Sequence, residues 1–401
     1  MKNKFALLLS FLTVLSFSIY SFGQEKQLTI QKLTEDLDGY FTKTILEQGF
    51  VGLGACLIKD NKIQWMNTYG YADREEKKPL QKNNIFQIAS LSKVFTATAI
   101  MQVYEKGLFS LDDDVNDYLP FKVRNPNFPD KPITFRMLLT HTSSFDDLLP
   151  AGNKILRGVK GDHPIKLSEY VTELFTPDGK YYSIDYFSKT YAPGDKYSYS
   201  NISFSLLGYL VESIMKQDFS EYCKKNIFEP LNMKNTGWHL KDLDVNNIAV
   251  CYGITGNDTS VFKRVDHFGV PGYPEGMLRT TLEDLSHFIL AYLNDGKYND
   301  YQLLKSETLK LMLSPEGIKN IPTRSFPVED IGLTWLKVNI DGHPYYTMNG
   351  FSGSIFTIAA FSLEYKTAMI YFFTGISMQN MLKSNQMTSK LVKAINELKV
   401  E

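Results

Sequence analysis

Apolar, strand-like segments lie near both ends of this chain, whereas its long middle part carries mostly helical patterns. Two of these segments meet at Asp60-Asn61, a residue pair suited to the tight turn of a β-hairpin. The other two are short apolar runs, which are typical of strands buried on both faces. The four predicted strands cover residues 51–59, 62–71, 354–362 and 367–373.

We expect the early and late strands to share one antiparallel sheet, because their apolar faces must be buried together. Amphipathic helices at 28–49 and 378–399 would flank that sheet. The sequence therefore predicts an α+β fold, in which an antiparallel sheet flanked by helices is joined to a mostly helical lobe. The sheet lobe would take residues 24–107 and 280–401, and the helical lobe residues 108–279. A cleft between the lobes is the natural place for a site.

Composition excludes several classes of function. The 401 residues are 43% hydrophobic and 22% charged, as in an ordinary globular protein. A net charge of −1 gives no electrostatic support for nucleic acid or an anionic membrane as a partner. The six histidines and three cysteines are scattered, so no metal site and no disulfide framework are predicted. We expect buried, apolar cysteines (with one disulfide as the alternative) and no cofactor. No oligomeric state is predicted.

The N-terminus has the pattern of a secretory signal peptide. Met1-Lys2-Asn3-Lys4 is basic, the run from 5 to 20 is mostly apolar, and the small residues Ser21 and Gly23 follow it. Cleavage after Gly23 would release a mature protein of residues 24–401, periplasmic or secreted, without a membrane span. The alternative is an uncleaved membrane anchor, since the apolar run is nearly long enough to span a bilayer.

Ser90 lies three residues before Lys93, at the start of a helix expected to stop at Gly107. Residues i and i+3 share a helix face, so the Lys93 amine can reach the Ser90 hydroxyl. A serine becomes a good nucleophile when a neighbouring base takes its proton, and a lysine does this once burial keeps it neutral. The same spacing recurs at Ser213–Lys216, so spacing alone is weak evidence.

A second candidate group is Tyr199-Ser200-Asn201, which follows the turn at Pro193-Gly194 and leads into a helical run over 202–215. A tyrosine can move protons if an adjacent cation, here a charged Lys93, lowers its pKa. In this scheme the lysine keeps its proton and the tyrosine loses one, whereas in the first scheme the lysine is neutral. The sequence does not choose between these two proton placements. The asparagine amide could hold a substrate amide or the lysine. The structural alternative is a Tyr-rich loop capping a helix.

Together these motifs resemble the serine β-lactamase and penicillin-binding superfamily, in particular its class C β-lactamase, esterase and D,D-peptidase-like branch. The resemblance covers nearly the whole mature chain and implies a β-lactamase/transpeptidase-like fold. It includes a segment with His141, which we interpret as a structural histidine on a loop, with a place in the cleft lining as the alternative. The matching segments are residues 90–97, 138–144, 193–194, 199–201, 227–233, 280–285 and 332–335.

The family's third motif is normally Lys-Thr-Gly or His-x-Gly on the strand beside the nucleophile. Here the best match is Met348-Asn349-Gly350, followed by Phe351. In the family that lysine helps to bind the carboxylate of β-lactams, whereas methionine offers no charge and no strong hydrogen bond. The resemblance thus implies weak β-lactam turnover and a preference for esters, amides or peptides. It also implies that Asn349, Gly350 and Phe351 border the substrate.

The resemblance implies an exported serine hydrolase that works through an acyl-serine intermediate. Ser90 would attack a carbonyl while Lys93 and Tyr199 share its proton, and Asn201 would orient the substrate. The backbone N–H groups of Ser90 and Phe351 would hold the oxyanion. The partner would be a small molecule or a peptide. The alternatives are a D,D-peptidase or penicillin-binding protein with weak β-lactamase activity, and a non-catalytic binding or sensor protein.

Overall fold

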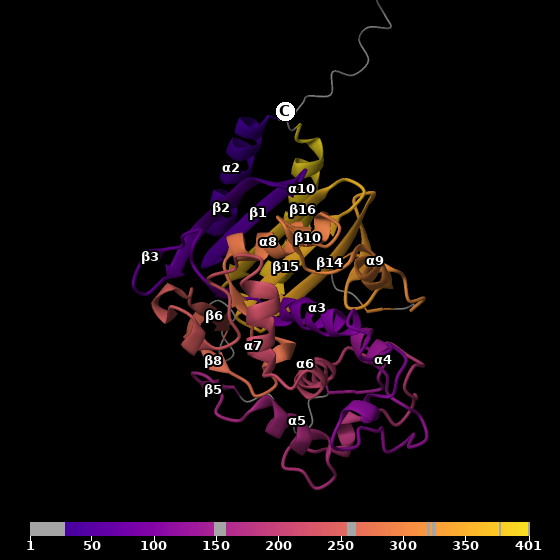
Figure 1. Ribbon diagram of the computed structural model, residues 1–401. Coiled ribbons are helices and arrows are strands. Elements are labelled where there is room, and N and C mark those ends of the chain that lie inside the picture. The colour runs from indigo at the N-terminus through magenta and orange to yellow at the C-terminus, as the bar shows by residue number, and fades with distance from the viewer. Residues whose placement is uncertain are drawn as a thin grey trace, which may run out of the picture.

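An antiparallel sheet of eight strands dominates the computed structural model (Figure 1). The structure describes residues 29–147, 158–254, 262–318, 321–322, 326–376 and 378–399. The strands lie in the order β12-β13-β14-β15-β16-β1-β2-β3. Their bounds are β12 Val328–Ile331, β13 Leu336–Ile340, β14 His343–Phe351, β15 Ile355–Ser362, β16 Thr367–Thr374, β1 Gly52–Lys59, β2 Lys62–Asp73 and β3 Lys78–Pro79.

The early and late strands pair at the centre of this sheet, as predicted. β1 runs antiparallel to β16 along its whole length, from the pair Gly52–Thr374 to the pair Lys59–Thr367. β1, β15 and β16 are buried almost throughout, which explains their continuous apolar runs. The β1–β2 turn at Asp60-Asn61 has φ values of 50° and 59°, the left-handed conformation that a two-residue hairpin requires.

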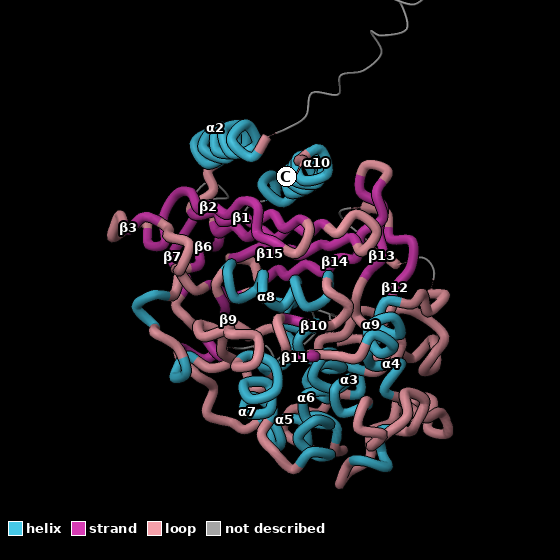
Figure 2. The backbone as a smooth tube through the Cα atoms, turned by 45° about the horizontal axis from the view of Figure 1, so that its top comes forward, coloured by secondary structure: helices cyan, strands magenta, loops and turns pink. Residues whose placement is uncertain are grey.

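Two terminal helices cover one face of the sheet. They are α2, Ile30–Gln48, and α10, Met378–Glu397, and Figure 2 shows both on the same side of the strands. Both match the predicted helices. Thr29 caps the N-terminus of α2, because its side chain accepts a hydrogen bond from a backbone N–H, and Gly49, whose φ is +70°, caps the C-terminus. Apolar residues of these helices and of the sheet face that they cover form one core.

The opposite face packs against α8, Leu282–Leu293, with α3, Lys93–Tyr104, and α6, Ile202–Met215, beyond it (Figure 2). These elements share a second and larger apolar core with that face. The predicted division into two lobes stays a prediction. The other helices are α4 Phe135–Leu139, α5 Leu167–Phe175, α7 Phe219–Cys223 and α9 Ser306–Leu313.

Four short antiparallel strand pairs supplement the main sheet, and the sequence pattern did not predict them. Three of the pairs draw strands from the predicted helical lobe. A ladder of two to four residues is too short to produce a recognisable apolar alternation. The pairs are β4 Phe86–Gln87 with β9 Arg279–Thr280, β5 Val159–Lys160 with β8 Phe268–Gly269, β6 Cys251–Ile254 with β7 Phe262–Val265, and β10 Lys297–Tyr298 with β11 Tyr301–Gln302.

Cys56, Cys223 and Cys251 are buried free thiols, as predicted, and none forms the alternative disulfide. The predicted signal peptide, residues 1–23, lies outside the described residues. Of the helices that the structure describes, none has both the length and the apolar character needed to cross a membrane.

Candidate active site

Ser90 lies in a tight turn between β4 and α3. The sequence placed it at the start of an α-helix, but the structure shows a 3₁₀ turn over Ala89–Ser92, and α3 begins only at Lys93. In a 3₁₀ turn the residues i and i+3 eclipse each other, so the turn still places Lys93 over Ser90. Ala89 has a φ of +46°, an uncommon conformation for a residue with a side chain, so the backbone is strained beside the hydroxyl.

Gly350 allows β14 to pack directly against this turn. A Cβ atom at that position would lie 2.1 Å from the carbonyl oxygen of Ile88 and 2.9 Å from the backbone nitrogen of Leu91. The Thr357 hydroxyl, on the neighbouring strand β15, donates to the same Ile88 carbonyl at 2.7 Å. The strand of the third motif is therefore fixed to the backbone that carries Ser90.

The Lys93 side chain is fully buried and lies at the centre of the site. Its Nζ donates to Ser90 Oγ at 3.2 Å, to Asn201 Oδ1 at 2.9 Å, and to the backbone carbonyl of Glu275. Burial lowers the pKa of Lys93 to about 8, although the negative charges of Glu275 and Asp147 oppose this effect. Near neutral pH the amine can therefore give up its proton at little cost.

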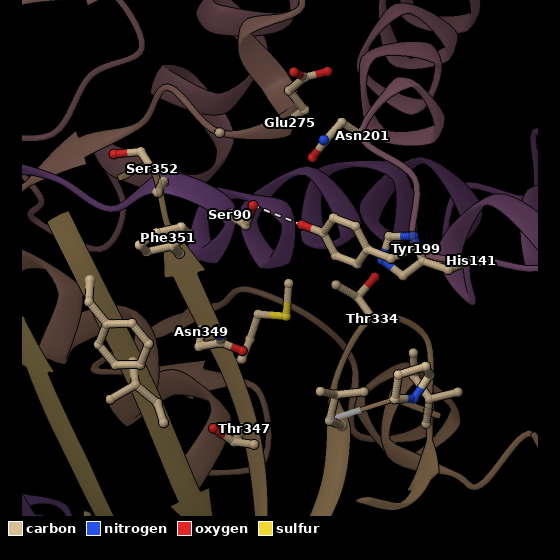
Figure 3. A pocket seen from close by; sticks show the side chains of 18 of the residues that line it. Ser90, His141, Tyr199, Asn201, Glu275, Thr334, Thr347, Asn349, Phe351 and Ser352 are labelled. Atoms are coloured by element: carbon tan, nitrogen blue, oxygen red, sulfur yellow. Dashed lines mark hydrogen bonds between the residues drawn. The ribbon is translucent and has the colours of Figure 1, made fainter. Parts of the chain in front are cut away.

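Tyr199 approaches Ser90 from the start of α6, and its Oη donates to Ser90 Oγ at 2.8 Å (Figure 3). Its ring lies 5.1 Å from Lys93 Nζ and stacks on His141 at a centroid distance of 4.5 Å. Burial raises the pKa of Tyr199, so the phenol keeps its proton. Of the two proton placements that the sequence left open, these directions favour Tyr199 as the proton donor and a Lys93 that can lose its proton and then act as the base.

Asp147 and His141 hold the segment that carries Tyr199 and Asn201. Asp147 Oδ2 accepts hydrogen bonds from the backbone N–H of Asn201 at 2.9 Å and of Ile202 at 3.3 Å, which caps the N-terminus of α6. His141 Nδ1 accepts from the N–H of Ser200 at 3.1 Å. Burial lowers the pKa of His141 to about 3, so it is neutral. His141 therefore has structural contacts, and it also lines the cleft, which the sequence left as the alternative.

Glu275 is a site residue that the sequence analysis missed. Its carboxylate is buried and accepts a hydrogen bond from the Ser205 hydroxyl at 2.7 Å, while its backbone carbonyl accepts from Lys93. Burial raises the pKa of Glu275 to about 7, and the positive charge of Lys93 opposes that rise. It lies 182 positions after Lys93, and no local pattern links the two residues.

The third-motif residues line the same cleft. Met348 is buried and Asn349 is exposed, while Phe351 is 44% exposed beside Ser90 (Figure 3). Ser352 N–H donates toward β15, to the carbonyl of Ile355. Because backbone groups of a strand alternate between its two edges, the Phe351 N–H points the other way, into the cleft. Five of the seven predicted site residues line this cleft, and the other two, Lys93 and Gly350, are buried behind it and contact Ser90 or its turn.

The cleft has a volume of about 840 Å³, within the range of small-molecule sites. Among its described lining residues the charged side chains are Asp146, Lys196 and Glu275. No cluster of three or more metal-ligating side chains occurs in the part of the chain that the structure describes. A buried lysine and tyrosine converging on one serine hydroxyl can activate that hydroxyl for attack on a carbonyl carbon.

Comparison with known proteins agrees with this geometry. A family model described as Beta-lactamase matches residues 29–381. Protein flp of Staphylococcus aureus (strain N315) is 27% identical over 293 residues, which cover 72% of this chain and 55% of that protein. This chain thus spans about half the length of the curated relatives that it matches.

Two solved structures show the same fold. D-amino acid amidase from Ochrobactrum anthropi SV3 has a TM-score of 0.73 at 20% identity, covering 90% of this chain and 98% of that one. EstCE1, a hydrolase with promiscuous acyltransferase activity, has a TM-score of 0.72 at 20% identity, covering 92% and 99%. At this identity the likeness shows the fold alone.

Proposed function

Since this chain belongs to the β-lactamase family, we propose that it is a serine hydrolase that cleaves an ester or amide through an acyl-Ser90 intermediate. The observation that carries the proposal is the convergence on Ser90 Oγ of Tyr199 Oη at 2.8 Å and Lys93 Nζ at 3.2 Å. A buried base and a proton donor at hydrogen-bond distance from one hydroxyl are what nucleophilic catalysis needs.

In the proposed reaction, Lys93 accepts the Ser90 proton as Oγ forms a bond to the substrate carbonyl carbon. The N–H groups of Ser90 and Phe351 stabilise the negative charge that develops on the carbonyl oxygen. The bond to the leaving group then breaks, and Tyr199 supplies the proton that the leaving group takes up. A water molecule next attacks the acyl carbon and gives its proton to Tyr199. The bond between the acyl carbon and Ser90 Oγ then breaks, and Oγ takes its proton back from Lys93 as the acid leaves. Asn201 holds Lys93 in place through its Oδ1.

The chemistry at Met348 supports esters and amides over β-lactams as substrates. Met348 lines the cleft beside Ser90 at the position where the third motif normally has a cationic or imidazole side chain. A thioether cannot pair with a carboxylate, so a substrate that carries one loses a charge-assisted hydrogen bond. Solved structures with this fold include an amidase, a hydrolase with acyltransferase activity and a class C β-lactamase, so the preference rests on Met348 and not on the fold.

Export is also part of the proposal. Residues 1–23 have the pattern of a cleaved signal peptide, which would place the enzyme in the periplasm or outside the cell. Sequencing of the N-terminus of the mature protein tests this, and an intact Met1 would refute it.

Mass spectrometry of the intact protein after exposure to acyl donors tests the reaction itself. We expect p-nitrophenyl acetate to add an acetyl group to the wild-type chain, and a Ser90→Ala variant to stay unmodified. Ser213→Ala is the matched control, because Ser213 has the same spacing to Lys216 but donates to the carbonyl of Tyr118. Equal ester hydrolysis by wild type and Ser90→Ala would refute the assignment. A stable adduct with penicillin and cleavage of D-Ala-D-Ala peptides would favour a D,D-peptidase.

A further inference from the structure

The cleft continues past Ser90 onto the opposite face of the sheet. β13 pairs with β14 only as far as Thr347, opposite Leu336, so the β14 edge beyond Thr347 has no strand beside it among the described residues. The cleft passes around this edge, because its lining includes residues of β14, β15 and β13. In Figure 3, Phe351, Asn349 and Thr347 follow one another along β14, away from Ser90.

These three side chains point to the face of the sheet that α10 covers. Successive side chains of a strand point to opposite faces, so Met348 and Gly350 face the Ser90 turn, whereas Thr347, Asn349 and Phe351 face the other way. The strand register places Ile358 beside Asn349 and Phe356 beside Phe351, and these side chains therefore share that face.

The far part of the cleft, which we call the apolar groove, has aliphatic and aromatic walls. None of the three charged side chains of the cleft belongs to it. Three of its residues, Val338, Phe356 and Ile358, are buried, and the other three are half-buried and can contact a ligand at its open side. The apolar groove is lined by Phe326, Val328, Leu336, Val338, Phe356 and Ile358.

The direction of the apolar groove indicates which part of a substrate enters it. The carbonyl oxygen points to the N–H of Phe351, and the leaving group must lie within reach of Tyr199, which protonates it. From Phe351 the strand runs past Asn349 to Thr347, and in Figure 3 Asn349 and Thr347 lie lower in the view than the Tyr199 ring. Four residues of extended strand span roughly 13 Å, which is room for an alkyl chain of medium length. Met348, an apolar and adaptable side chain, lines the entrance.

We propose that the apolar groove binds an extended alkyl chain on the leaving group of the substrate. The preferred substrates would then be esters of medium- or long-chain alcohols, or the matching amides of alkylamines. This inference rests on the proposed function, since it takes the position of the leaving group from Ser90 and Tyr199. The driving force is removal of the chain from water, which gives about two- to fourfold in kcat/KM for each added methylene.

Two ester series test the proposal, with acid release followed in a pH-stat. In acetate esters lengthened from ethyl to octyl, kcat/KM should rise with each methylene of the alcohol. In ethyl esters lengthened from acetate to octanoate it should stay nearly constant. Leu336→Gln and Phe326→Gln should each lower the ratio of octyl to ethyl acetate kcat/KM about tenfold. Leu363→Gln, an exposed residue at the β15–β16 turn, should leave that ratio unchanged.

A binding measurement separates this inference from the proposed function, because it needs no turnover. Calorimetry with Ser90→Ala should show that decanol binds more tightly than butanol, again by about two- to fourfold per methylene. Loss of ester hydrolysis alone would refute the proposed function and leave this result intact. The proposal for the apolar groove would be overturned by equal binding of the two alcohols or by tighter binding of a compact aromatic alcohol. A rise of kcat/KM only in the series with lengthened acyl groups would overturn it as well.

Discussion

A methyl group at Gly350 should separate the third-motif strand from the nucleophile. The added Cβ would lie 2.1 Å from the carbonyl oxygen of Ile88, whereas real Cβ atoms essentially never approach closer than 3.0 Å. Of the three atoms within 3.0 Å of this Cβ, two are backbone atoms of the Ser90 turn and the third is the Thr357 hydroxyl at 2.6 Å, so β14 and the turn must part by about 0.9 Å. The N–H of Phe351, the next residue, moves with the strand. A displacement of about 1 Å costs about a hundredfold in rate, and loss of one oxyanion donor costs about 10²–10³.

We therefore expect Gly350→Ala to lower kcat for an activated ester about a hundredfold, with a loss of about 1–3 kcal/mol in the free energy of unfolding. Stopped-flow acylation by p-nitrophenyl acetate and thermal denaturation measure the two effects. Gly39→Ala is the control, because a Cβ there contacts nothing within 4 Å, and it should keep full activity. A folded Gly350→Ala variant with activity within threefold of wild type would show that this contact does not position the site.

Two further predictions concern charge in the site. Since deprotonated Lys93 is the proposed base and its pKa is about 8, kcat/KM should rise with pH up to an apparent pKa near 8. The negative charge of Glu275 raises the pKa of Lys93, so Glu275→Gln should move the rise of kcat/KM to lower pH. A rise that moves to higher pH or stays fixed would contradict Lys93 as the base. Met348→Lys should increase the acylation rate by a chromogenic cephalosporin about tenfold, since it supplies a cation for the carboxylate; no increase would refute our interpretation of Met348.

The parts of the fold that follow from local pattern could be predicted from the sequence. Short apolar runs specified β15 and β16, the Asp60-Asn61 turn and its flanking apolar segments specified β1, and a helical pattern specified α6 over the predicted residues. The 3₁₀ turn over Ala89–Ser92 could not be predicted, because the strain at Ala89 depends on packing of β4 and β14 around it.

The candidate site divides in the same way. Ser90, Lys93 and Tyr199 could be predicted from their residue types and motifs. Glu275 could not, because only the tertiary fold brings it to Lys93. The sequence also left the proton placement open, because that placement depends on how deeply Lys93 and Tyr199 are buried. The course of the cleft around β14 depends on where β13 stops pairing, which no periodicity shows.

The pairing of β1 with β16 also determines when this molecule can acquire activity during synthesis. A ribosome adds roughly 5–20 residues per second, so the hairpin of β1 and β2 waits for β16 for tens of seconds. An isolated hairpin is only marginally stable in water. During this time β1 is an unpaired apolar strand and is prone to aggregate. A nascent chain stalled before β14 would carry Ser90, Lys93 and Tyr199 and still hydrolyse nothing, since the strand that completes their surroundings emerges among the last.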